Sequence, residues 1–339
     1  MPRSARTHLA QYPQVVQDGR HSQTEIFGAA RTRGKMKTLR IDFSDFYPGF
    51  NKNDNFFYNR LSKRFNLQIC EAPDYLIYAH EGNHHRLHNC TKIFFNVESI
   101  APDFTDCDYA LTCHQLDDPR HYRLPYYAYE HPAAPLIRQP NEWESIQREK
   151  TKFCSFVVGN VHKKTRPRIR FFEKLNARRK VDSAGKALNN FGRIVSVHEK
   201  MDFLRPYRFT IAFENEAIPG YTTEKIYQAM RARCIPIYRG SSHIAEEFNP
   251  KSFLNYDDYP SEEALIDRII EIDQSEELFA EFHKQPYFHH NVPNSCYDDE
   301  RLLDFFERIF STAIVPVRRK RYFFQFGRWI FVKRHRLRK

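Results

Sequence analysis

Glycine is scarce in this sequence, with 11 glycines among 339 residues. No G-x-G-x-x-G follows any strand-like run, so the fingerprint of dinucleotide-binding Rossmann folds is absent. The seven cysteines are an odd number, form no C-x-x-C pair and mostly lie in apolar runs, as Cys154 and Cys234 do. This usage favours reduced core cysteines of a cytoplasmic protein over a disulfide framework.

Long apolar runs are also missing. No stretch reaches the roughly 20 apolar residues that a membrane-spanning helix needs. The first residues, MPRSARTHLAQYPQ, contain no apolar core of a signal peptide. We therefore expect a cytoplasmic protein that is either soluble or peripheral to a membrane.

Acidic residues are absent from residues 318–339, which contain ten Lys and Arg. The whole chain has a formal net charge of +11, whereas residues 38–317 have 36 basic and 40 acidic groups, so the charge lies at the ends. As a helix, 318–339 would place Phe323, Phe326 and Ile330 on one side. This pattern predicts a basic amphipathic tail at the anionic inner face of the cytoplasmic membrane. A solvated basic tail that packs some aromatics on the body is the alternative, and nucleic acid is not an expected partner.

The chain is longer than one hydrophobic core usually holds, so we expect two domains. Residues 1–36 are polar and aperiodic, which predicts a disordered extension. Apolar strand-like runs then alternate with helical ones, which is typical of parallel βαβ units in an α/β fold. The polar segment 139–152 is the expected connection between the domains. In 208–258 the order strand, turn, helix, strand, helix, strand predicts a doubly wound, Rossmann-like second domain.

The turn FENEAIPGYTTEK within this second half has the features of an anion site. A strand ends at Asn215, a Pro-Gly turn follows, and Thr222 or Thr223 caps the next helix. The first turn of that helix offers free backbone N–H groups and a positive dipole end, and Lys225 adds a cation. Ligands of open α/β folds bind at the carboxyl ends of strands, where this turn lies. An ordinary capped helix fits the same residues, because a lysine in the first turn is common.

Two further side chains stand at positions that suit chemistry. Arg168 opens the helix RIRFFEKL just after a buried strand, where a guanidinium can direct two hydrogen bonds to a diphosphate. Because other basic residues surround it, a solvated arginine fits the pattern as well. Glu98 ends the strand TKIFFNVE and has the place of a general base, although a glutamate at such a position is more often simply exposed.

Two sequence patterns resemble metal-binding motifs, but we expect neither of them to bind a metal. Asp106-Cys107-Asp108 spells D-x-D, a metal-binding pattern of many sugar-nucleotide enzymes, but it leads into the apolar run YALTC. The segment HEGNHHRLHNC contains four histidines and Cys90, with spacings that fit no usual zinc motif. We expect no metal site here and a polar loop at the histidines.

The segment 209–259 closely resembles the α-1,3/4-fucosyltransferases, glycosyltransferase family ten. The motifs FENEAIPGYTTEKI and IPIYRGSSHIAEEFNPKSFLNYDDY carry the resemblance, which extends more weakly over about 39–310 through FVVGN, RIRFFEKL and FFNVESIAPDF. It implies a GT-B architecture, in which two Rossmann-like domains face each other across a cleft. Residues 37–150 would bind the acceptor and 151–290 would bind GDP-fucose. A helix within 291–317 is expected to pack back on the first domain, ahead of the basic amphipathic tail 318–339.

The resemblance also implies the reaction and the residues that perform it. An inverting enzyme would transfer L-fucose from GDP-fucose to a hydroxyl of an oligosaccharide or glycolipid acceptor, expected to be O3 of GlcNAc or glucose, without a cofactor or an essential metal. Glu98 stands where the family has its proposed general base. Arg168 and Lys225 would neutralise the diphosphate, and Glu224 would meet the ribose. The family's donor-binding positions fall on Arg168, Asn215, Tyr221, Glu224 and Lys225.

Three departures from the family pattern affect both substrates. The family commonly has Ser or Thr where this chain has Glu216, and often Ser at Gly159. It commonly reads G-E-N where this chain has Glu98 between a valine and a serine. We therefore expect the acceptor or its orientation to differ from that of other members.

Two other functions remain open at this point. One is a transferase that uses another GDP-sugar, and the other is a non-catalytic, basic peripheral membrane protein that binds lipid without turnover. The joint presence of Glu98, Arg168, Glu224 and Lys225 favours a catalytic protein.

Overall fold

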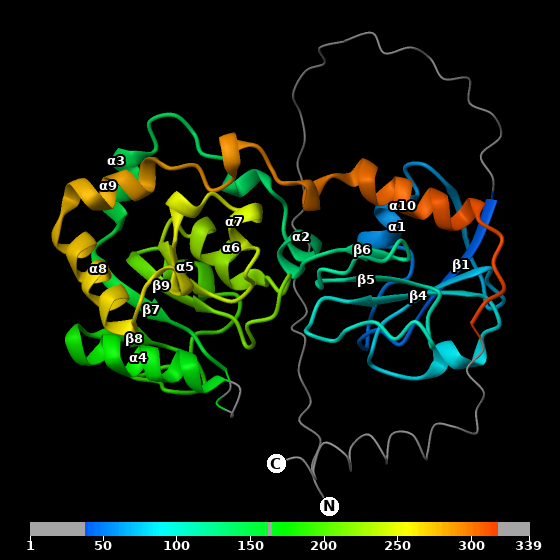
Figure 1. The fold of residues 1–339 in the computed structure, drawn as a ribbon, viewed down its shortest axis with the longest axis horizontal. Coiled ribbons are helices and arrows are strands. Elements are labelled where there is room, and N and C mark those ends of the chain that lie inside the picture. Colours follow the sequence, from blue (N-terminus) through cyan, green and yellow to red (C-terminus); the bar gives the residue numbers. More distant parts are fainter. Residues whose placement is uncertain (1–37, 160, 162–164, 318–339) are drawn as a thin grey trace, which may run out of the picture.

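The computed structural model describes residues 38–159, 161 and 165–317. Two α/β units lie side by side, the N-terminal one in blue to cyan and the C-terminal one in green to yellow (Figure 1). Each unit contains one parallel sheet, which confirms the predicted α/β class. None of the helices in this part of the chain combines the length and the apolar character that a bilayer span requires. The extension 1–36 and the tail 318–339 lie outside the described residues, so the expectations for them are not tested here.

The sheet of the first unit has six parallel strands in the order β2-β1-β3-β4-β5-β6. All six residues of β4 are buried, as is typical of a central strand covered on both faces. The sequence patterns did not predict β6, because its three residues, HYR, are polar and only partly buried. The strands are β1 (Thr38–Ser44), β2 (Asn66–Ile69), β3 (Tyr75–Tyr78), β4 (Thr91–Asn96), β5 (Tyr109–Thr112) and β6 (His121–Arg123).

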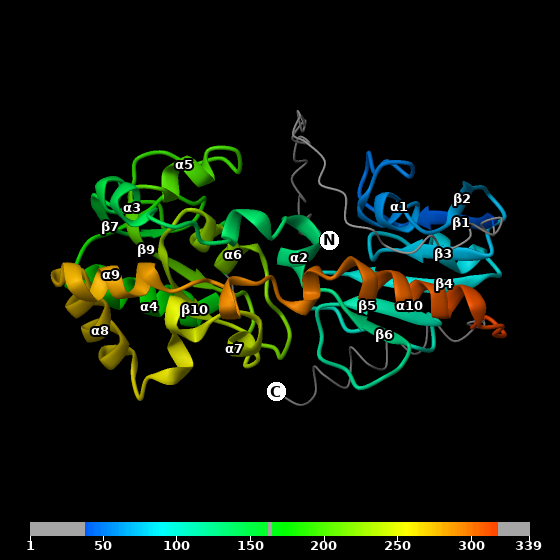
Figure 2. The same ribbon diagram turned by 90° about the horizontal axis from the view of Figure 1, so that it is seen from above.

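Two helices pack on this first sheet from distant parts of the sequence. The helix α1 (Phe56–Leu61) follows β1, whereas α10 (Asp299–Ser311) belongs to the orange segment that returns from the second unit (Figures 1 and 2). Leu302 and Phe306 of α10 are buried in the same core as Phe57. The guanidinium of Arg64 forms ion pairs with three carboxylates along α10. The last described helix is therefore part of the first unit.

The sheet of the second unit has five parallel strands in the order β8-β7-β9-β10-β11. The chain runs from β7 outward to β8 and then returns to β9 on the other side of β7. The strand order thus reverses between β7 and β9, and open parallel sheets bind ligands at the carboxyl ends of strands at such a point. The strands are β7 (Lys152–Phe156), β8 (Val181–Ser183), β9 (Tyr207–Phe213), β10 (Ile235–Arg239) and β11 (Leu254–Asn255).

Helices cover this second sheet and connect it to the first unit. In α6 the residues Ile226, Ala229 and Met230, at positions i, i+3 and i+4, are buried and form the apolar face of the helix. All seven cysteines are unpaired, and five of them are buried, as expected. The remaining helices are α2 (Tyr126–Glu130), α3 (Trp143–Glu149), α4 (Arg166–Arg178), α5 (Lys200–Leu204), α6 (Glu224–Arg231), α7 (Ile244–Glu247), α8 (Glu262–Gln274) and α9 (Glu276–Lys284), with short 3-10 turns at η1 (His84–Leu87), η2 (Ala134–Leu136), η4 (Pro250–Ser252), η5 (Tyr256–Asp258), η6 (His289–Asn291) and η7 (Ser295–Tyr297).

Candidate active site

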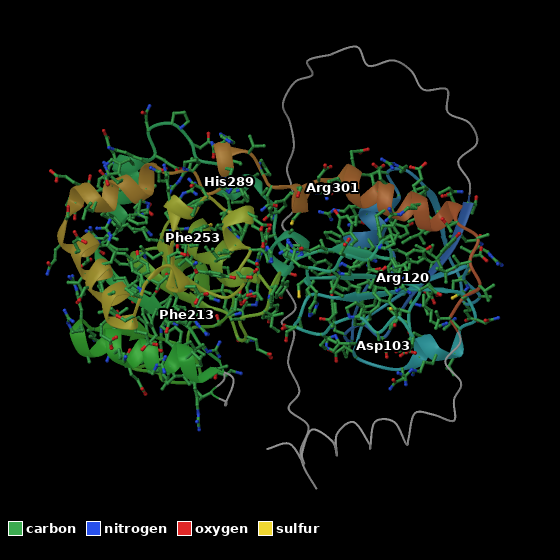
Figure 3. The ribbon with its side chains drawn as sticks, in the orientation of Figure 1. Asp103, Arg120, Phe213, Phe253, His289 and Arg301 are labelled. Atoms are coloured by element: carbon green, nitrogen blue, oxygen red, sulfur yellow. The ribbon has the colours of Figure 1, made fainter. Side chains whose placement is uncertain are left out.

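The point where the second sheet reverses its strand order brings Arg168 and Asn215 together. The strand β9 ends at Phe213, which is labelled in Figure 3, and Asn215 lies two residues beyond it. Arg168 lies in the first turn of α4, and its Nη1 donates a hydrogen bond of 2.7 Å to Asn215 Oδ1. Arg168 is 5% exposed. Burial lowers the pKa of this guanidinium, and the nearby Glu214 counteracts the effect.

The N-terminus of α6 holds the second predicted cation. Thr223 caps the helix, as predicted. The Lys225 ammonium donates to Thr223 Oγ1 at 2.9 Å and to Glu214 Oε2 at 3.0 Å. The buried Glu214 carboxylate also accepts from the Thr223 N–H and hydroxyl, each at 2.7 Å. The sequence patterns did not single out Glu214, which fixes both the cap and the cation.

The charges at this N-terminus depend on one another. Burial raises the pKa of Glu214, and Lys225 opposes that rise. Burial acts in the same direction on Glu224, but Lys225 and Lys200 outweigh it and lower the pKa of Glu224 to about 2. For Lys225 itself, burial lowers the pKa, whereas Glu214 and Glu224 raise it further. Lys225 and Glu224 are therefore both charged at neutral pH.

Glu98 belongs to the first unit and reaches the second one through Tyr221. It lies two residues after β4, where its N–H donates to Asn96 Oδ1 at 2.6 Å. Its Oε2 accepts a hydrogen bond of 2.8 Å from the Tyr221 hydroxyl. Tyr221 is 1% exposed, and its burial together with the nearby carboxylates of Glu214 and Glu98 raises its pKa far above the usual value. Tyr221 is therefore a neutral donor that holds one oxygen of the Glu98 carboxylate.

The Pro-Gly turn before Tyr221 is fixed against the first unit. Gly220 has a φ of +86°, and a Cβ at this position would lie 2.4 Å from the carbonyl oxygen of Cys113. Glycine is the residue that adopts this conformation without strain and allows such a close approach. Arg123 donates to the Gly220 carbonyl oxygen at 2.9 Å and forms an ion pair of 2.7 Å with Glu247. These contacts fix the position of Tyr221 relative to the first unit.

The predicted residues thus converge at the junction of the two units. Glu98 is also close enough to Lys225 to raise the pKa of that ammonium. The sequence patterns missed Arg123 and Lys200, because no motif surrounds them, and they did not single out Glu214 although it lies within FENEAIPGYTTEK. The predicted residues form three adjoining pairs, which are Arg168 with Asn215, Glu224 with Lys225, and Glu98 with Tyr221.

The D-x-D segment and the histidine segment both make structural contacts within the first unit. Asp106 forms an ion pair of 2.8 Å with Arg86. The buried His85 contacts Asp45 at 2.6 Å through Nδ1, and its ring stacks on Tyr78. Within 38–159, 161 and 165–317, no three His, Cys, Asp or Glu side chains converge in a way that would hold a metal ion.

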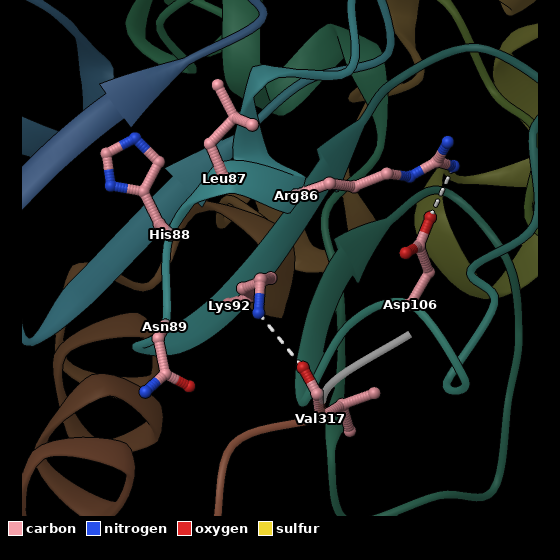
Figure 4. A pocket seen from close by; sticks show the side chains of 7 residues that line it. All are labelled: Arg86, Leu87, His88, Asn89, Lys92, Asp106 and Val317. Atoms are coloured by element: carbon pink, nitrogen blue, oxygen red, sulfur yellow. Dashed lines mark hydrogen bonds and ion pairs between the residues drawn. The ribbon is translucent and has the colours of Figure 1, made fainter. Parts of the chain in front are cut away.

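A separate pocket of about 300 Å³ lies beside these residues, away from the predicted site (Figure 4). Within it, Lys92 Nζ donates to the carbonyl oxygen of Val317 at 3.0 Å. None of the six predicted site residues lines this pocket, whose lining is Arg86, Leu87, His88, Asn89, Lys92, Asp106 and Val317.

Comparison with known families shows to which family the chain belongs. Residues 41–129 match the Alpha-(1,3)-fucosyltransferase FucT N-terminal domain, and residues 147–299 match the C-terminal domain of glycosyltransferase family 10 (fucosyltransferase). Together the two models match more than two thirds of the chain. The chain belongs to glycosyltransferase family 10. The family 10 models contain all six predicted site residues.

Curated relatives of this family 10 member come from bacteria, viruses and animals. The Alpha-(1,3)-fucosyltransferase FucT of Helicobacter pylori is 30% identical over 248 residues, which are 62% of this chain and 51% of that protein. A human 4-galactosyl-N-acetylglucosaminide 3-alpha-L-fucosyltransferase is 30% identical over 143 residues, 41% of this chain and 36% of that protein. These matches span about half of the relatives' length or less.

Solved structures show the same fold over most of the family 10 chain. A crystal structure of alpha1,3-fucosyltransferase with GDP superimposes with a TM-score of 0.69 at 24% identity, covering 86% of this chain and 95% of that chain. One with GDP-fucose gives a TM-score of 0.66 at 25% identity, covering 85% and 96%. The GT-B architecture expected from the sequence is therefore confirmed.

Proposed function

We propose that this family 10 member is an inverting fucosyltransferase that moves L-fucose from GDP-fucose to an oligosaccharide hydroxyl, such as O3 of GlcNAc or glucose in N-acetyllactosamine. The contact between Glu98 and Tyr221 carries the proposal. It places a carboxylate of the first unit beside the turn that leads into the cationic N-terminus of α6. Relatives named as fucosyltransferases, one of them crystallised with GDP-fucose, support the choice of donor.

In the proposed reaction, Glu98 acts as the general base. The Tyr221 hydroxyl holds Oε2, which leaves Oε1 to take the proton of the acceptor hydroxyl. The acceptor oxygen then forms a bond to C1 of fucose from the face opposite GDP. The bond between C1 and the diphosphate oxygen breaks, and its electron pair stays on GDP. This single displacement inverts the anomeric centre.

The leaving diphosphate gains negative charge as that bond breaks. Arg168 and Lys225, together with the N-terminus of α6, supply positive charge fixed in place before the reaction. Glu214 and Thr223 take two hydrogen bonds from the Lys225 ammonium, which has three donors, so one donor is left for a phosphate oxygen. Because these cations stabilise the charge where it develops, we propose that the reaction needs no divalent metal.

The test is the acceptor-dependent release of GDP from GDP-fucose in the presence of EDTA. We expect release with N-acetyllactosamine or lactose for the wild type. We expect the same for the control Lys180→Met, which replaces an exposed lysine at the opposite end of the second sheet. Glu98→Gln and Lys225→Met should both lose it. GDP-mannose, offered in place of GDP-fucose, tests the alternative of another GDP-sugar. Absence of GDP-fucose binding by the wild type would overturn the proposal.

For residues 318–339 we propose attachment to an anionic membrane surface on the cytoplasmic side. The support is compositional, namely ten basic residues without an acidic one, interspersed with aromatics. The full chain should sediment with phosphatidylglycerol vesicles but not with phosphatidylcholine vesicles. A chain ending at residue 317 should sediment with neither. Lipid binding without any turnover would favour the non-catalytic alternative instead.

A further inference from the structure

A small pocket lies at the reversal point of the second sheet, between the ends of β7 and β9. Phe156 closes it from β7, and Phe213 from β9. Its volume of about 20 Å³ is enough for one water-sized group, such as a single phosphate oxygen or hydroxyl. The pocket is lined by Arg168 and Lys225, and also by a third cation, Lys200.

Lys200 lies outside the motifs and is not one of the six predicted site residues. It is the first residue of α5, a helix that contacts α6. Its side chain makes no hydrogen bond and no ion pair with any residue in the described part of the chain. Burial lowers the pKa of Lys200, and Glu224 only partly compensates. A partly buried ammonium beside two other cations has an unfavourable free energy, which a bound anion would compensate.

Gln228 gives a second, independent sign of a missing ligand in the same pocket. It lies one turn after Glu224 in α6 and is 6% exposed. Among the described residues, its buried amide oxygen has no hydrogen-bond partner. Buried polar atoms in native proteins are normally paired, and an unpaired one that lines a pocket is expected to be satisfied by a bound molecule or water.

The charges show which class of ligand would complete this pocket. Arg168, Lys200 and Lys225 provide three positive charges, and the adjoining carboxylates of Glu214 and Glu224 provide two negative ones. The diphosphate of a nucleotide sugar adds two more negative charges, and a further one develops when the sugar leaves. With all three cations the pocket has a net charge of +1 before the donor binds and −1 with the diphosphate in place, whereas with only Arg168 and Lys225 these sums are 0 and −2.

We propose that Lys200 is a third cation of the donor site that binds an oxygen of the nucleoside diphosphate. The Gln228 amide, turned so that its N–H2 group takes the place of the unpaired oxygen, donates a hydrogen bond to the same ligand. The inference rests on the proposed function, because it assigns a further contact to the same donor. It places Lys200 among the residues that bind the leaving group. Lys200 reaches the pocket from α5, a helix that lies outside the sequence motifs.

Calorimetric titration of the full chain with GDP and with guanosine tests this assignment. Lys200→Met should weaken GDP binding by about tenfold or more, since a charge-assisted hydrogen bond is lost. Binding of guanosine, which has no phosphate, should not change. Lys200→Arg should restore most of the GDP affinity, and GDP binding by Lys200→Met should depend less on salt than that of the wild type. The matched control is again Lys180→Met, which should bind GDP as the wild type does.

Gln228→Leu separates the hydrogen bond from the charge. It should weaken GDP binding by a smaller factor and leave its salt dependence unchanged. Thermal unfolding of each variant shows whether it is folded. GDP binding that Lys225→Met weakens and Lys200→Met leaves unchanged would overturn this inference alone. A wild type that binds no GDP would overturn the proposed function together with it.

Discussion

Replacing Tyr221 with phenylalanine removes one hydroxyl and, with it, the 2.8 Å hydrogen bond to Glu98 Oε2. A hydrogen bond to a charged group contributes about 1.5–3 kcal/mol, and each 1.36 kcal/mol is a factor of ten in rate. If the hydroxyl positions the base, kcat should fall about tenfold to a hundredfold. The affinity for GDP should stay close to that of the wild type, because the hydroxyl contacts Glu98. The donor-binding role that the family resemblance implies for Tyr221 predicts a loss of GDP affinity instead.

Steady-state rates with GDP-fucose, combined with GDP titration, separate these two effects. Tyr207→Phe is a matched control, because Tyr207 is equally buried and donates a 2.8 Å hydrogen bond to Asp182 at the opposite end of β9. It should lose stability but keep kcat. The reasoning would be refuted by a Tyr221→Phe enzyme with a kcat within twofold of the wild type. It would also be refuted by a loss confined to GDP affinity, since the hydroxyl would then act on the donor.

Three further changes have expected outcomes. Gly220→Ala should destabilise the protein by about 1–3 kcal/mol in chemical denaturation, because φ is +86° and the new Cβ meets the Cys113 carbonyl; an unchanged midpoint would argue against this turn. Lys225→Met should remove about 2–4 kcal/mol of transition-state stabilisation, which is a fall in kcat/KM of about thirtyfold to a thousandfold. A fall in kcat/KM below about threefold would contradict the role of Lys225 at the diphosphate. Burial and the charge of Glu224 raise the pKa of Glu130 from 4.5 to about 7. Folding therefore favours the protonated carboxyl group, and this contribution to the free energy of unfolding, fully present below pH 4.5, is lost as the pH rises through 7. Glu130→Gln should therefore be more stable than the wild type at pH 8, by up to about 3 kcal/mol, and similar to it at pH 5, whereas equal pH dependence would exclude this effect.

The sequence predicted the course of the chain around FENEAIPGYTTEK well, because its signals are local. A buried strand that ends in FEN, a Pro-Gly turn and a capping threonine determine the path of the chain from β9 into α6. Arg168 could be placed for a similar reason, since it begins the helix that follows β7. Their positions at the carboxyl ends of adjacent strands follow from the parallel topology.

Other features depend on contacts between distant segments that no local pattern shows. The strand β8 has three residues, VDS, and exists because it pairs with β7 at the sheet edge. Lys200 stands in the unremarkable segment EKMDFL and enters the pocket only because α5 packs beside α6. Arg123 similarly meets Gly220 across the two units. The roles assigned to these residues and to the six predicted ones remain predictions until the variants are measured.

The acceptor depends on the first unit, where the family resemblance is weaker and Glu98 has different neighbours from those common in the family. A panel of lactose, N-acetyllactosamine and its 3-galactosyl isomer, offered to the wild type with GDP-fucose, distinguishes O3 from O4 of the sugar. We expect transfer to O3, and transfer only to the isomer would show O4 instead.

The most direct measurement is nuclear magnetic resonance of the product made from GDP-fucose and N-acetyllactosamine by the wild type and by Glu98→Gln. We expect one added fucose in α linkage for the wild type, opposite in configuration to the β-linked donor, and no product for Glu98→Gln. A β-linked product, or equal product from Glu98→Gln, would contradict the single displacement with Glu98 as its base.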